Sequence, residues 1–433
     1  MKFIDKLEKK EYEKFVKKHE KSHFLQSYAW GQFSKEAKGL IPYYVGLKDE
    51  NNKLVATALL LKKKLPLGYS YFYSPRGFVV DFNNFELLNS FTSEIIKFTK
   101  KHKSIFLKID PDIIWSQKDC NDLEVKTDNN AKEIFDNLKK IGFKHLGFTQ
   151  EFETMQPRYT FRIDMTKSIE EIESKFSKTT KQRIKKAESI HTDVKIGNSN
   201  DIEEFNKLMT ITENRKNFVS HDLDYYKKLY EIYNKDNKFL IFLGSVDLEQ
   251  IINQYSNEIK SYEEELEKLP KENLSKSQNT KKKDLNDKII KHKKLLDEYT
   301  KYQKEYGNKI TLNAHAIIIY NDKAWVLYAG NHNILTSTYS NYKTYYEHIK
   351  YCHDNGIKMY DQFGSVAPTC KDKSRLGLYE FKKKFGGNFV EFIGEFDLIT
   401  NKIMYLVFTK LVPLYRNIIR NIAKRKKRDE EWY

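Results

Sequence analysis

The 433-residue sequence is poor in the residues that mark fibrous, disulfide-linked or membrane-spanning chains. It holds 17 glycines and 8 prolines, too few for a collagen-like or low-complexity protein. Its 3 cysteines, Cys120, Cys352 and Cys370, lack the spacing of a metal site, so we expect them to be small buried or neutral residues. The longest apolar runs, such as 403–408, fall far short of the roughly 20 residues that span a bilayer. We predict neither a bound metal nor a transmembrane helix.

Aromatic residues and positive charge are abundant instead. Aromatics make up 14% of the chain, with 29 Tyr and 28 Phe, and rings of that number favour folded cores over disorder. Lys and Arg total 77 against 60 Asp and Glu, which gives a net charge of +17. That excess predicts an anionic partner: RNA, a phosphorylated metabolite or an acidic membrane surface. The N-terminal residues 1–11 suggest a charged amphipathic helix without a signal peptide's apolar core, so we expect a cytoplasmic protein.

Residues 247–306 form a polar segment with a heptad-like repeat. Apolar or aromatic positions recur at alternating steps of about 4 and 3 residues over 248–269, and again over 285–306 after a polar turn. Two such seams predict an antiparallel helical hairpin. The first helix has seven acids and two bases, and the second has eleven bases and six acids, so the helices attract each other and the arm is neutral overall. A self-paired interaction arm and a direct RNA contact both remain open. The predicted seam is Leu248, Ile252, Tyr255, Ile259, Tyr262, Leu266 and Leu269, continued by Leu285, Ile289, His292, Leu296, Tyr299, Gln303 and Tyr306.

Outside this arm, the two halves of the chain repeat one order of elements. Each half shows strands, a helix, a strand that ends in aspartate (Asp110 or Asp361), a helix and a final strand. The last two elements are predicted as a helix at 378–385 and one strand at 389–396. Interleaved helices and strands indicate an α/β fold, and the order matches two acetyltransferase-like (GNAT-type) mixed-sheet domains. The expected domains are 1–155, then 156–246 with 307–402, the coiled-coil arm 247–306 and a basic tail 403–433.

Signature motifs of nucleotide, metalloprotease and hydrolase sites are absent from the sequence. It has no P-loop, GxGxxG, HExxH or GxSxG. The Arg/Gln-x-x-Gly-x-Gly loop that holds the pyrophosphate in coenzyme-A-dependent acetyltransferases is missing from both halves. An acyl-transfer scaffold without that loop predicts an acyl donor other than acyl-coenzyme A, and no cofactor.

Seven tracts, taken in order, resemble the Fem family of non-ribosomal peptidyltransferases (the FemX, FemA and MurM type). The resemblance covers nearly the whole chain and includes the arm in the family's usual place. It implies transfer of an amino acid from aminoacyl-tRNA to a peptidoglycan precursor, either lipid II or a UDP-linked muropeptide, in building the interpeptide bridge of the cell wall. The tracts are Phe24–Ser27 with Trp30, Arg76–Asp81, Lys108–Asp112, Gly142–Phe148, Gln156–Arg158, Leu378–Lys382 and Ile393–Asp397.

The resemblance also implies functional residues. Lys382 matches the family lysine held against the reacting carbonyl, where a fixed ammonium would stabilise an oxyanion. Asp110 matches an aspartate that would position the acceptor amine, and Asp361 is given a structural role. Lys35 takes the place of a phosphate-binding lysine, while His221 stands where the family has an arginine and would bind phosphate more weakly. The remaining substrate-binding positions are Tyr225, Tyr328, Phe381 and Glu395.

Two basic tracts could meet anionic partners. Lys178, Lys181 and Lys185 step by 3 and 4 residues and share one helical face, which suits either solvent or the tRNA backbone. In the C-terminal tail, Arg416 and Arg420 belong to a basic amphipathic pattern that suits anionic lipid. We therefore expect peripheral contact with the inner face of the plasma membrane.

The leading hypothesis is an aminoacyltransferase that moves glycine, alanine or serine from aminoacyl-tRNA to the stem-peptide amine of lipid II. Two alternatives stay open: a coenzyme-A-dependent N-acyltransferase on the same fold, and a non-enzymatic adaptor that uses the arm. The sequence makes no prediction of the oligomeric state.

Overall fold

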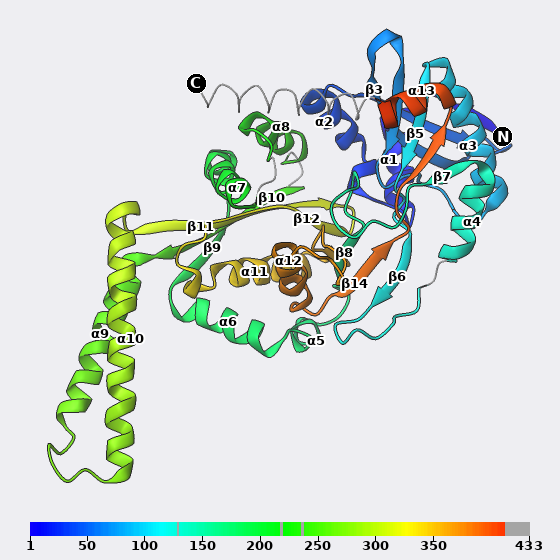
Figure 1. Cartoon of the computed structure of the whole chain (residues 1–433). Helices are drawn as coiled ribbons and strands as arrows, with labels where there is room; N and C mark the ends of the chain where they lie inside the picture. The colour runs from blue at the N-terminus through cyan, green and yellow to red at the C-terminus, as the bar shows by residue number, and fades with distance from the viewer. Residues whose placement is uncertain (128–129, 217–219, 235–237, 412–433) are drawn as a thin grey trace, which may run out of the picture. The chain divides into compact units, whose positions relative to one another are not determined.

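The computed structural model describes residues 1–127, 130–216, 220–234 and 238–411 (Figure 1). The chain forms two compact units. Unit 1 comprises residues 1–162, 361–383 and the chain from 387 onward, and unit 2 comprises residues 163–360 and 384–386. This division differs from the sequence-based domains, which assign 156–162 and all of 361–402 to the second domain. The physical reason is that the last strand of the chain pairs with strands of the first half.

Unit 1 is built on a seven-stranded mixed sheet of order β1-β2-β3-β4-β5-β15-β7. β4 and β5 run parallel with Ser74 opposite Ile109, so both strands end at the same edge of the sheet. β15 lies antiparallel between β5 and β7 and places Phe396 opposite both Ile109 and His145. The strands are β1 (Lys2–Ile4), β2 (Ile41–Lys48), β3 (Leu54–Lys64), β4 (Ser70–Ser74), β5 (Ser104–Ile109), β7 (Phe143–His145) and β15 (Phe396–Ile399).

Helices with one apolar face cover this sheet. In α3 (Phe85–Lys101), Leu88, Phe91 and Ile95 recur at helical spacing and are fully buried. Asn84 caps the helix by accepting the N–H of Leu87. The other helices of unit 1 are α1 (Lys9–Lys18), α2 (Tyr28–Lys38), α4 (Ala131–Ile141), α12 (Lys373–Lys383) and α13 (Lys402–Leu406).

Three further strands pair antiparallel, with β14 between the other two. They are β6 (Ile114–Lys118), β14 (Asn388–Phe392) and β8 (Tyr159–Asp164).

Unit 2 contains four antiparallel strands in the order β12-β11-β10-β9. Gly330 on β12 (Lys323–Asn331) lets helix α7 (Ile202–Lys216) approach the sheet, since a Cβ at this position would lie 2.7 Å from the backbone of Leu208 and Met209. The strands are β9 (Thr192–Ile196), β10 (Phe239–Asp247), β11 (Lys309–Tyr320), β12 (Lys323–Asn331) and β13 (Met359–Asp361), and the helices outside the arm are α5 (Ile169–Ser174), α6 (Lys178–Ser189), α7 (Ile202–Lys216), α8 (Leu223–Tyr233) and α11 (Ser340–Asp354).

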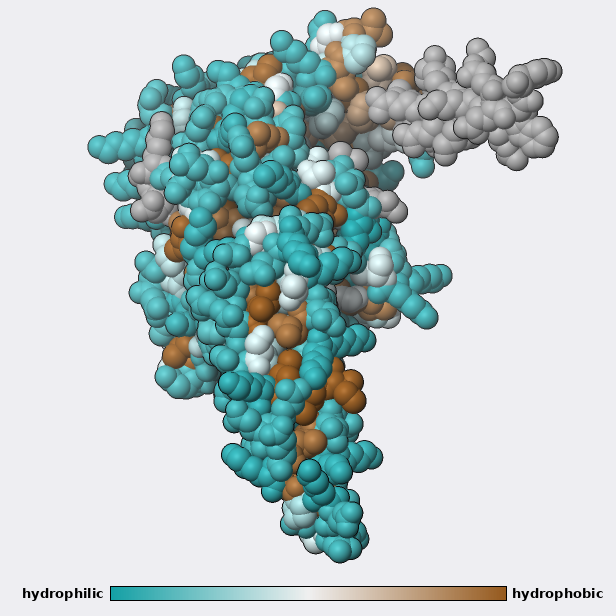
Figure 2. Space-filling model, turned by 90° about the vertical axis from the view of Figure 1, so that its left-hand side faces the viewer, coloured by the Kyte–Doolittle hydropathy of each residue, from teal (hydrophilic) through white to brown (hydrophobic). Residues whose placement is uncertain are grey.

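The arm is an antiparallel pair of helices, α9 (Leu248–Glu267) and α10 (Lys276–Tyr306), that continues from the paired strands β10 and β11 (Figure 1). Lys293 pairs with Glu263 at 2.8 Å, and the rings of Tyr255 and Tyr299 stack 5.7 Å apart. Figure 2 shows an apolar stripe along the arm between hydrophilic flanks. At the base the seam buries Ile251, whereas the predicted Ile252 is only partly buried, because this end of α9 packs into the core of unit 2.

Several expected elements differ from the structure. Residues 2–4 form strand β1, with Phe3 opposite Leu47, and the first helix starts only at Lys9, because sheet pairing outweighs the local helical pattern. α12 begins at Lys373, before the predicted start. The strand expected at 389–396 is divided into β14 and β15 at Gly394, whose φ is +95°. The predicted α/β fold class is confirmed.

No helix in the described ranges is both long and apolar enough to cross a bilayer. The three cysteines are free; Cys352 and Cys370 are buried and Cys120 is partly buried.

Candidate active site

Lys382 lies on the buried face of α12, and its ammonium is enclosed by backbone carbonyls. Nζ donates to the carbonyl oxygens of Gln362, Phe363 and Gly364 at 2.7, 2.5 and 2.5 Å. The residue is 4% exposed, and burial lowers its pKa to about 7, while the charge of Asp361 opposes this shift. Three acceptors match the three protons of an ammonium. Any further acceptor must therefore take the place of one of these carbonyls.

The turn at 362–364 brings the three carbonyls together through unusual backbone conformations. Phe363 and Gly364 have φ values of +42° and +71°, in the left-handed region. Asp361 Oδ1 accepts the N–H of Phe363 at 2.8 Å, and the Gln362 side chain donates to the Lys382 carbonyl at 3.2 Å. Lys382 and this turn thus hold each other in place.

Asp110 follows β5, at the sheet edge where the parallel strand β4 also ends. Its Oδ2 accepts the hydroxyl proton of Tyr73 at 2.8 Å, and its Oδ1 accepts the backbone N–H of Arg76 at 2.7 Å. Asp110 is 2% exposed; burial raises its pKa to about 7, with Arg76 acting in the opposite direction. The carboxyl group is held by protein donors on both oxygens, which suits a positioning role.

Arg76 is a candidate site residue to which sequence reasoning gave no role. It has a φ of +51°, donates from Nη2 to the carbonyl of Pro157 at 2.6 Å, and places its guanidinium 4.1 Å from the centre of the Phe392 ring. The available signal was topological: adjacent parallel strands end at one edge, so the residues that follow β4 and β5 meet.

Glu395 and Lys108 form a second buried charge cluster in unit 1. Glu395 Oε2 accepts from Lys108 Nζ at 3.0 Å, and its Oε1 accepts the N–H of Met155 at 2.5 Å. Lys108 also pairs with Asp397 at 3.0 Å. Although burial lowers the pKa of Lys108, the carboxylates of Asp397 and Glu395 raise it overall. The charge of Glu395 also helps to raise the pKa of Asp110, which links the two clusters. In the sequence Lys108 is part of the tract Lys108–Asp112, and that tract assigns it no role of its own.

The two other predicted residues of unit 1 lie apart from these contacts. Lys35 is exposed in the last turn of α2, and no hydrogen bond or ion pair among the described residues joins it to Lys382 or Asp110. Phe381 precedes Lys382 on α12 and is partly buried.

In unit 2, three predicted substrate-binding residues meet. The hydroxyls of Tyr225 and Tyr328 lie 2.8 Å apart, and the exposed His221 ring stacks on Tyr225 with a centroid distance of 3.6 Å. Burial raises the pKa of both tyrosines, so their hydroxyls stay protonated. The group offers ring faces, hydroxyls and an imidazole, which suits a peptide or sugar-phosphate ligand.

The basic face of α6 has the predicted geometry. Lys178, Lys181 and Lys185 are exposed, while Ile184 and Ala187 of the same helix are buried. Among the described residues none of these three lysines forms a salt bridge, although Lys181 donates to the Ser174 carbonyl at 3.2 Å.

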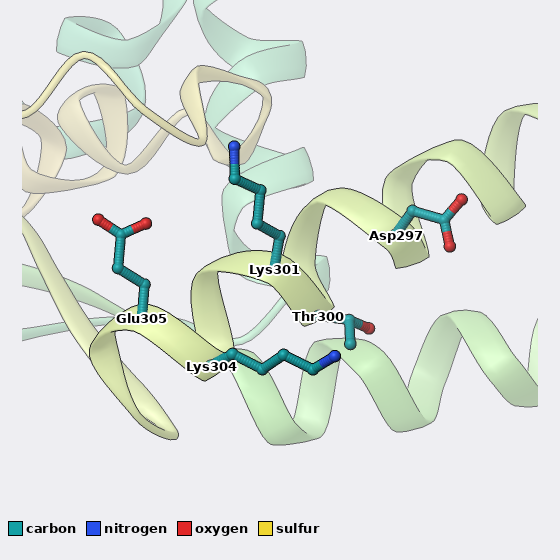
Figure 3. A pocket seen from close by; sticks show the side chains of 5 residues that line it. All are labelled: Asp297, Thr300, Lys301, Lys304 and Glu305. Carbon is teal, nitrogen blue, oxygen red and sulfur yellow. The ribbon is translucent and has the colours of Figure 1, made fainter.

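A surface hollow of about 520 Å³ lies on the arm and contains none of the predicted site residues. Its lining side chains all come from α10 and point in different directions rather than converging on one point (Figure 3). We assign it no ligand. Its lining residues are Asp297, Thr300, Lys301, Lys304 and Glu305.

Comparisons with known proteins match nearly the whole length of the chain. The sequence model of the FemAB family matches residues 7–412. The lipid II:glycine glycyltransferase of Staphylococcus epidermidis is 29% identical over 406 residues, covering 93% of this chain and 94% of that protein. The protein of the same name from Staphylococcus aureus is 29% identical over 430 residues, covering 96% and 98%. A solved structure, "Crystal structure of FemX", aligns with a TM-score of 0.72 and 28% identity, covering 94% of this chain and 99% of that one.

Proposed function

The chain belongs to the FemAB family and is a transferase, and from this premise we propose that it moves an amino acid from aminoacyl-tRNA to the stem-peptide amine of lipid II. Of glycine, alanine and serine, we favour glycine, because the matching staphylococcal proteins are named lipid II:glycine glycyltransferases. The product would be an interpeptide bridge of the cell wall.

The transfer reaction requires the protein to position the two substrates and to stabilise the charge that develops in the transition state. The acceptor amine attacks the ester carbonyl, a C–N bond forms, and the C–O bond to the tRNA ribose breaks. The amine loses a proton and the ribose oxygen gains one. Catalysis therefore depends on orienting the two substrates and on stabilising the negative charge that develops on the carbonyl oxygen.

The observation that carries the proposal is the enclosed ammonium of Lys382. In the resting protein its protons go to neutral carbonyls of the turn at 362–364. A developing oxyanion accepts a hydrogen bond more strongly than a neutral carbonyl does. Exchange of one carbonyl for the substrate oxygen is thus most favourable in the transition state, which is the requirement for raising the rate rather than merely binding substrate.

Other residues take supporting roles in this proposal. Asp110 orients the acceptor amine through the structure it builds with Tyr73 and Arg76. For the acceptor's stem peptide and phosphates, the proposed binding residues in unit 1 are Lys35, Phe381 and Glu395, and those in unit 2 are His221, Tyr225 and Tyr328. The exposed lysines of α6 bind the tRNA backbone, because they form a cationic face without carboxylate partners among the described residues.

We also propose that the chain contacts the anionic membrane surface where lipid II resides. The basic pattern behind this proposal lies at 412–433, outside the described residues. Flotation with acidic vesicles, for the full chain and a chain truncated after Leu411, tests it: the full chain should float and the truncated chain should not.

The decisive experiment incubates the purified chain with lipid II and tRNAs charged separately with glycine, alanine or serine, followed by mass spectrometry. We expect the mass of one or more glycine residues to be added. Modification of the acceptor with acetyl-coenzyme A but with no charged tRNA would establish the coenzyme-A alternative. Intact cellular function in a Lys382→Met strain would favour the adaptor.

A further inference from the structure

Arg162, on β8, is clamped between two carboxylates from separate parts of unit 1. Its Nε donates to Asp361 Oδ2 at 2.8 Å and its Nη2 donates to Asp112 Oδ2 at 2.7 Å. The Arg162 side chain is only 16% exposed, so both pairs are weakly screened. A planar guanidinium presents its N–H groups in a fixed fork, so it sets the orientation of both acceptors.

The second carboxylate oxygen of Asp361 connects Arg162 to the neighbouring turn at 362–364. Oδ1 accepts from the Thr160 hydroxyl and from the N–H of Phe363 at 2.8 Å. Asp361 is 1% exposed, so these donors replace water entirely. Arg162 and Thr160 thereby fix Asp361, and Asp361 fixes the amide of Phe363.

Phe363 is the central residue of the turn whose carbonyls enclose Lys382. The groups Asp112, Arg162, Asp361 and Lys382 alternate in charge and sum to zero. The negative charge of Asp361 also favours the ammonium form of Lys382 against the effect of burial. Removal of the fork at Arg162 would therefore loosen the enclosure without touching Lys382.

We propose that Arg162 is a positioning residue for the transfer reaction, which acts by holding Asp361 and, through the turn at 362–364, the Lys382 ammonium. This inference rests on the proposed catalytic role of Lys382. Neither the family match nor the sequence tracts assign Arg162 a role.

The test compares Arg162→Lys with Arg158→Lys in the full chain. Arg162 lies on β8 and Arg158 directly precedes that strand. Both pair with carboxylates, Arg158 with Glu391, but among the described residues no hydrogen bond or ion pair joins Arg158 to the turn. Lysine keeps the charge and loses the fork. Three quantities are measured: the thermal midpoint, kcat and KM for both substrates, and the rate at which an amine-acylating reagent labels Lys382 relative to its neighbour Lys383.

In Arg162→Lys we expect faster labelling of Lys382 with unchanged labelling of Lys383, and kcat lower by on the order of 10²-fold at similar KM. Arg158→Lys should leave the labelling ratio and kcat close to wild type. Unchanged labelling and kcat in a folded Arg162→Lys protein would overturn the inference. If that variant fails to fold, Asp361→Asn, which keeps an oxygen for the Phe363 amide, should show the same labelling change, and unchanged labelling would overturn the inference. Absence of transfer by the wild type would reject the proposed function and, with it, a role of Arg162 in transfer, whereas labelling altered as expected would still show that Arg162 holds the Lys382 ammonium in place.

Discussion

At the scale of single residues, the candidate active site is defined by two buried ionisable groups, Lys382 and Asp110, which backbone groups hold in place. Lys382 donates to three carbonyls, and Asp110 accepts one backbone amide and one hydroxyl. Burial shifts the pKa of each to about 7 from opposite directions. Each group can therefore change its protonation state near neutral pH, and each can be tested through its charge.

Lys382→Met removes the proposed oxyanion donor while keeping an unbranched side chain of similar length. We expect kcat to fall by on the order of 10²–10³-fold with little change in either substrate's dissociation constant. The matched control is Lys383→Met, because Lys383 lies next in the helix and pairs with Asp122 near the surface. Loss of acceptor affinity with intact single-turnover chemistry would make Lys382 a binding residue.

Asp110→Asn should show the electrostatic cost of burying a carboxylate. Burial raises the folded-state pKa to about 7, whereas an unfolded aspartate titrates near 4. The folded state then binds more protons between about pH 4 and 7, so the stabilisation from protonated Asp110 is complete below pH 4 and is lost as pH rises through 7. The thermal midpoint of Asp110→Asn relative to wild type should therefore rise from pH 5 to pH 8.

Asp112→Asn is the control for that titration. Although burial raises the pKa of Asp112, Arg162 lowers it overall to below its usual range. Asp112 is ionised above pH 5 in both the folded and the unfolded chain. The thermal midpoint of Asp112→Asn should therefore differ from that of the wild type by a constant amount between pH 5 and pH 8. A constant difference for Asp110→Asn as well would contradict the assignment.

The sequence predicted functional residues that a family tract or a strand end marks directly. It did not predict roles that depend on a contact with a residue far away in the sequence. Lys382 and Asp110 stood out through tracts and strand ends. The contact of Asp110 with Arg76 depends on the parallel pairing of β4 and β5. The bridge from Arg162 to Asp361 joins residues about 200 positions apart, and no local pattern announces it.

At the scale of elements, α6 presents the clearest surface for an anionic ligand. Replacing Lys178, Lys181 and Lys185 with glutamine should weaken tRNA binding and reduce the slope of log K against log salt by about 2 to 3, because each phosphate contact releases counterions. Binding titrations at several salt concentrations measure this slope. The same change at Lys282, Lys283 and Lys291 on α10 removes equal charge from the arm and should leave the slope unaltered; equal losses would dismiss a specific role for α6.

Helix α11 carries a titratable group in the core of unit 2. His348 is fully buried, its Nδ1 lies 3.1 Å from the Tyr360 hydroxyl, and burial, with a smaller contribution from His315, lowers its pKa well below the usual value. The unfolded chain binds this proton near pH 6.5, so stability falls as pH drops below that value. In His348→Gln the midpoint should fall less steeply than in wild type between pH 7 and pH 5. Parallel curves would contradict this.

Element boundaries were predictable where a helix or strand carries its own signal. The strand that ends at Asp110 and the helix before it were predicted in this order and are present as β5 and α3, because strong periodicity coincides there with turns or a cap. Residues 2–4 were misassigned, since their strand exists only through pairing with β2. The single strand predicted at 389–396 was likewise wrong, because β14 ends at Phe392 and β15 begins only at Phe396, and these two strands pair with different partners.

At the scale of the whole molecule, the arm can be shortened without removing the core of unit 2. Its function can therefore be tested in a protein that still folds. Its base is part of the core of unit 2: Leu248, Ile251, Tyr255 and Tyr299 pack with Val246 and other buried residues. In its distal half, residues 260–291, the buried apolar residues among the described ones are Leu285 and Ile289. The surface ion pairs there, such as Lys281 with Glu265, stabilise little. A four-residue loop can join Ile259 to His292, because paired helices lie about 8–10 Å apart.

We expect this shortened chain to keep its thermal midpoint within a few degrees of wild type, since every buried contact at the base remains. Replacing the whole arm would expose the core below it and lower the midpoint clearly more. Because the two helices balance each other's charge, the shortened chain should also keep its KM for glycyl-tRNA in a lipid II transfer assay. A large rise in that KM with intact folding would assign RNA contact to the distal arm. Normal transfer by the purified shortened chain, combined with loss of function in cells, would instead show that the arm binds a protein partner.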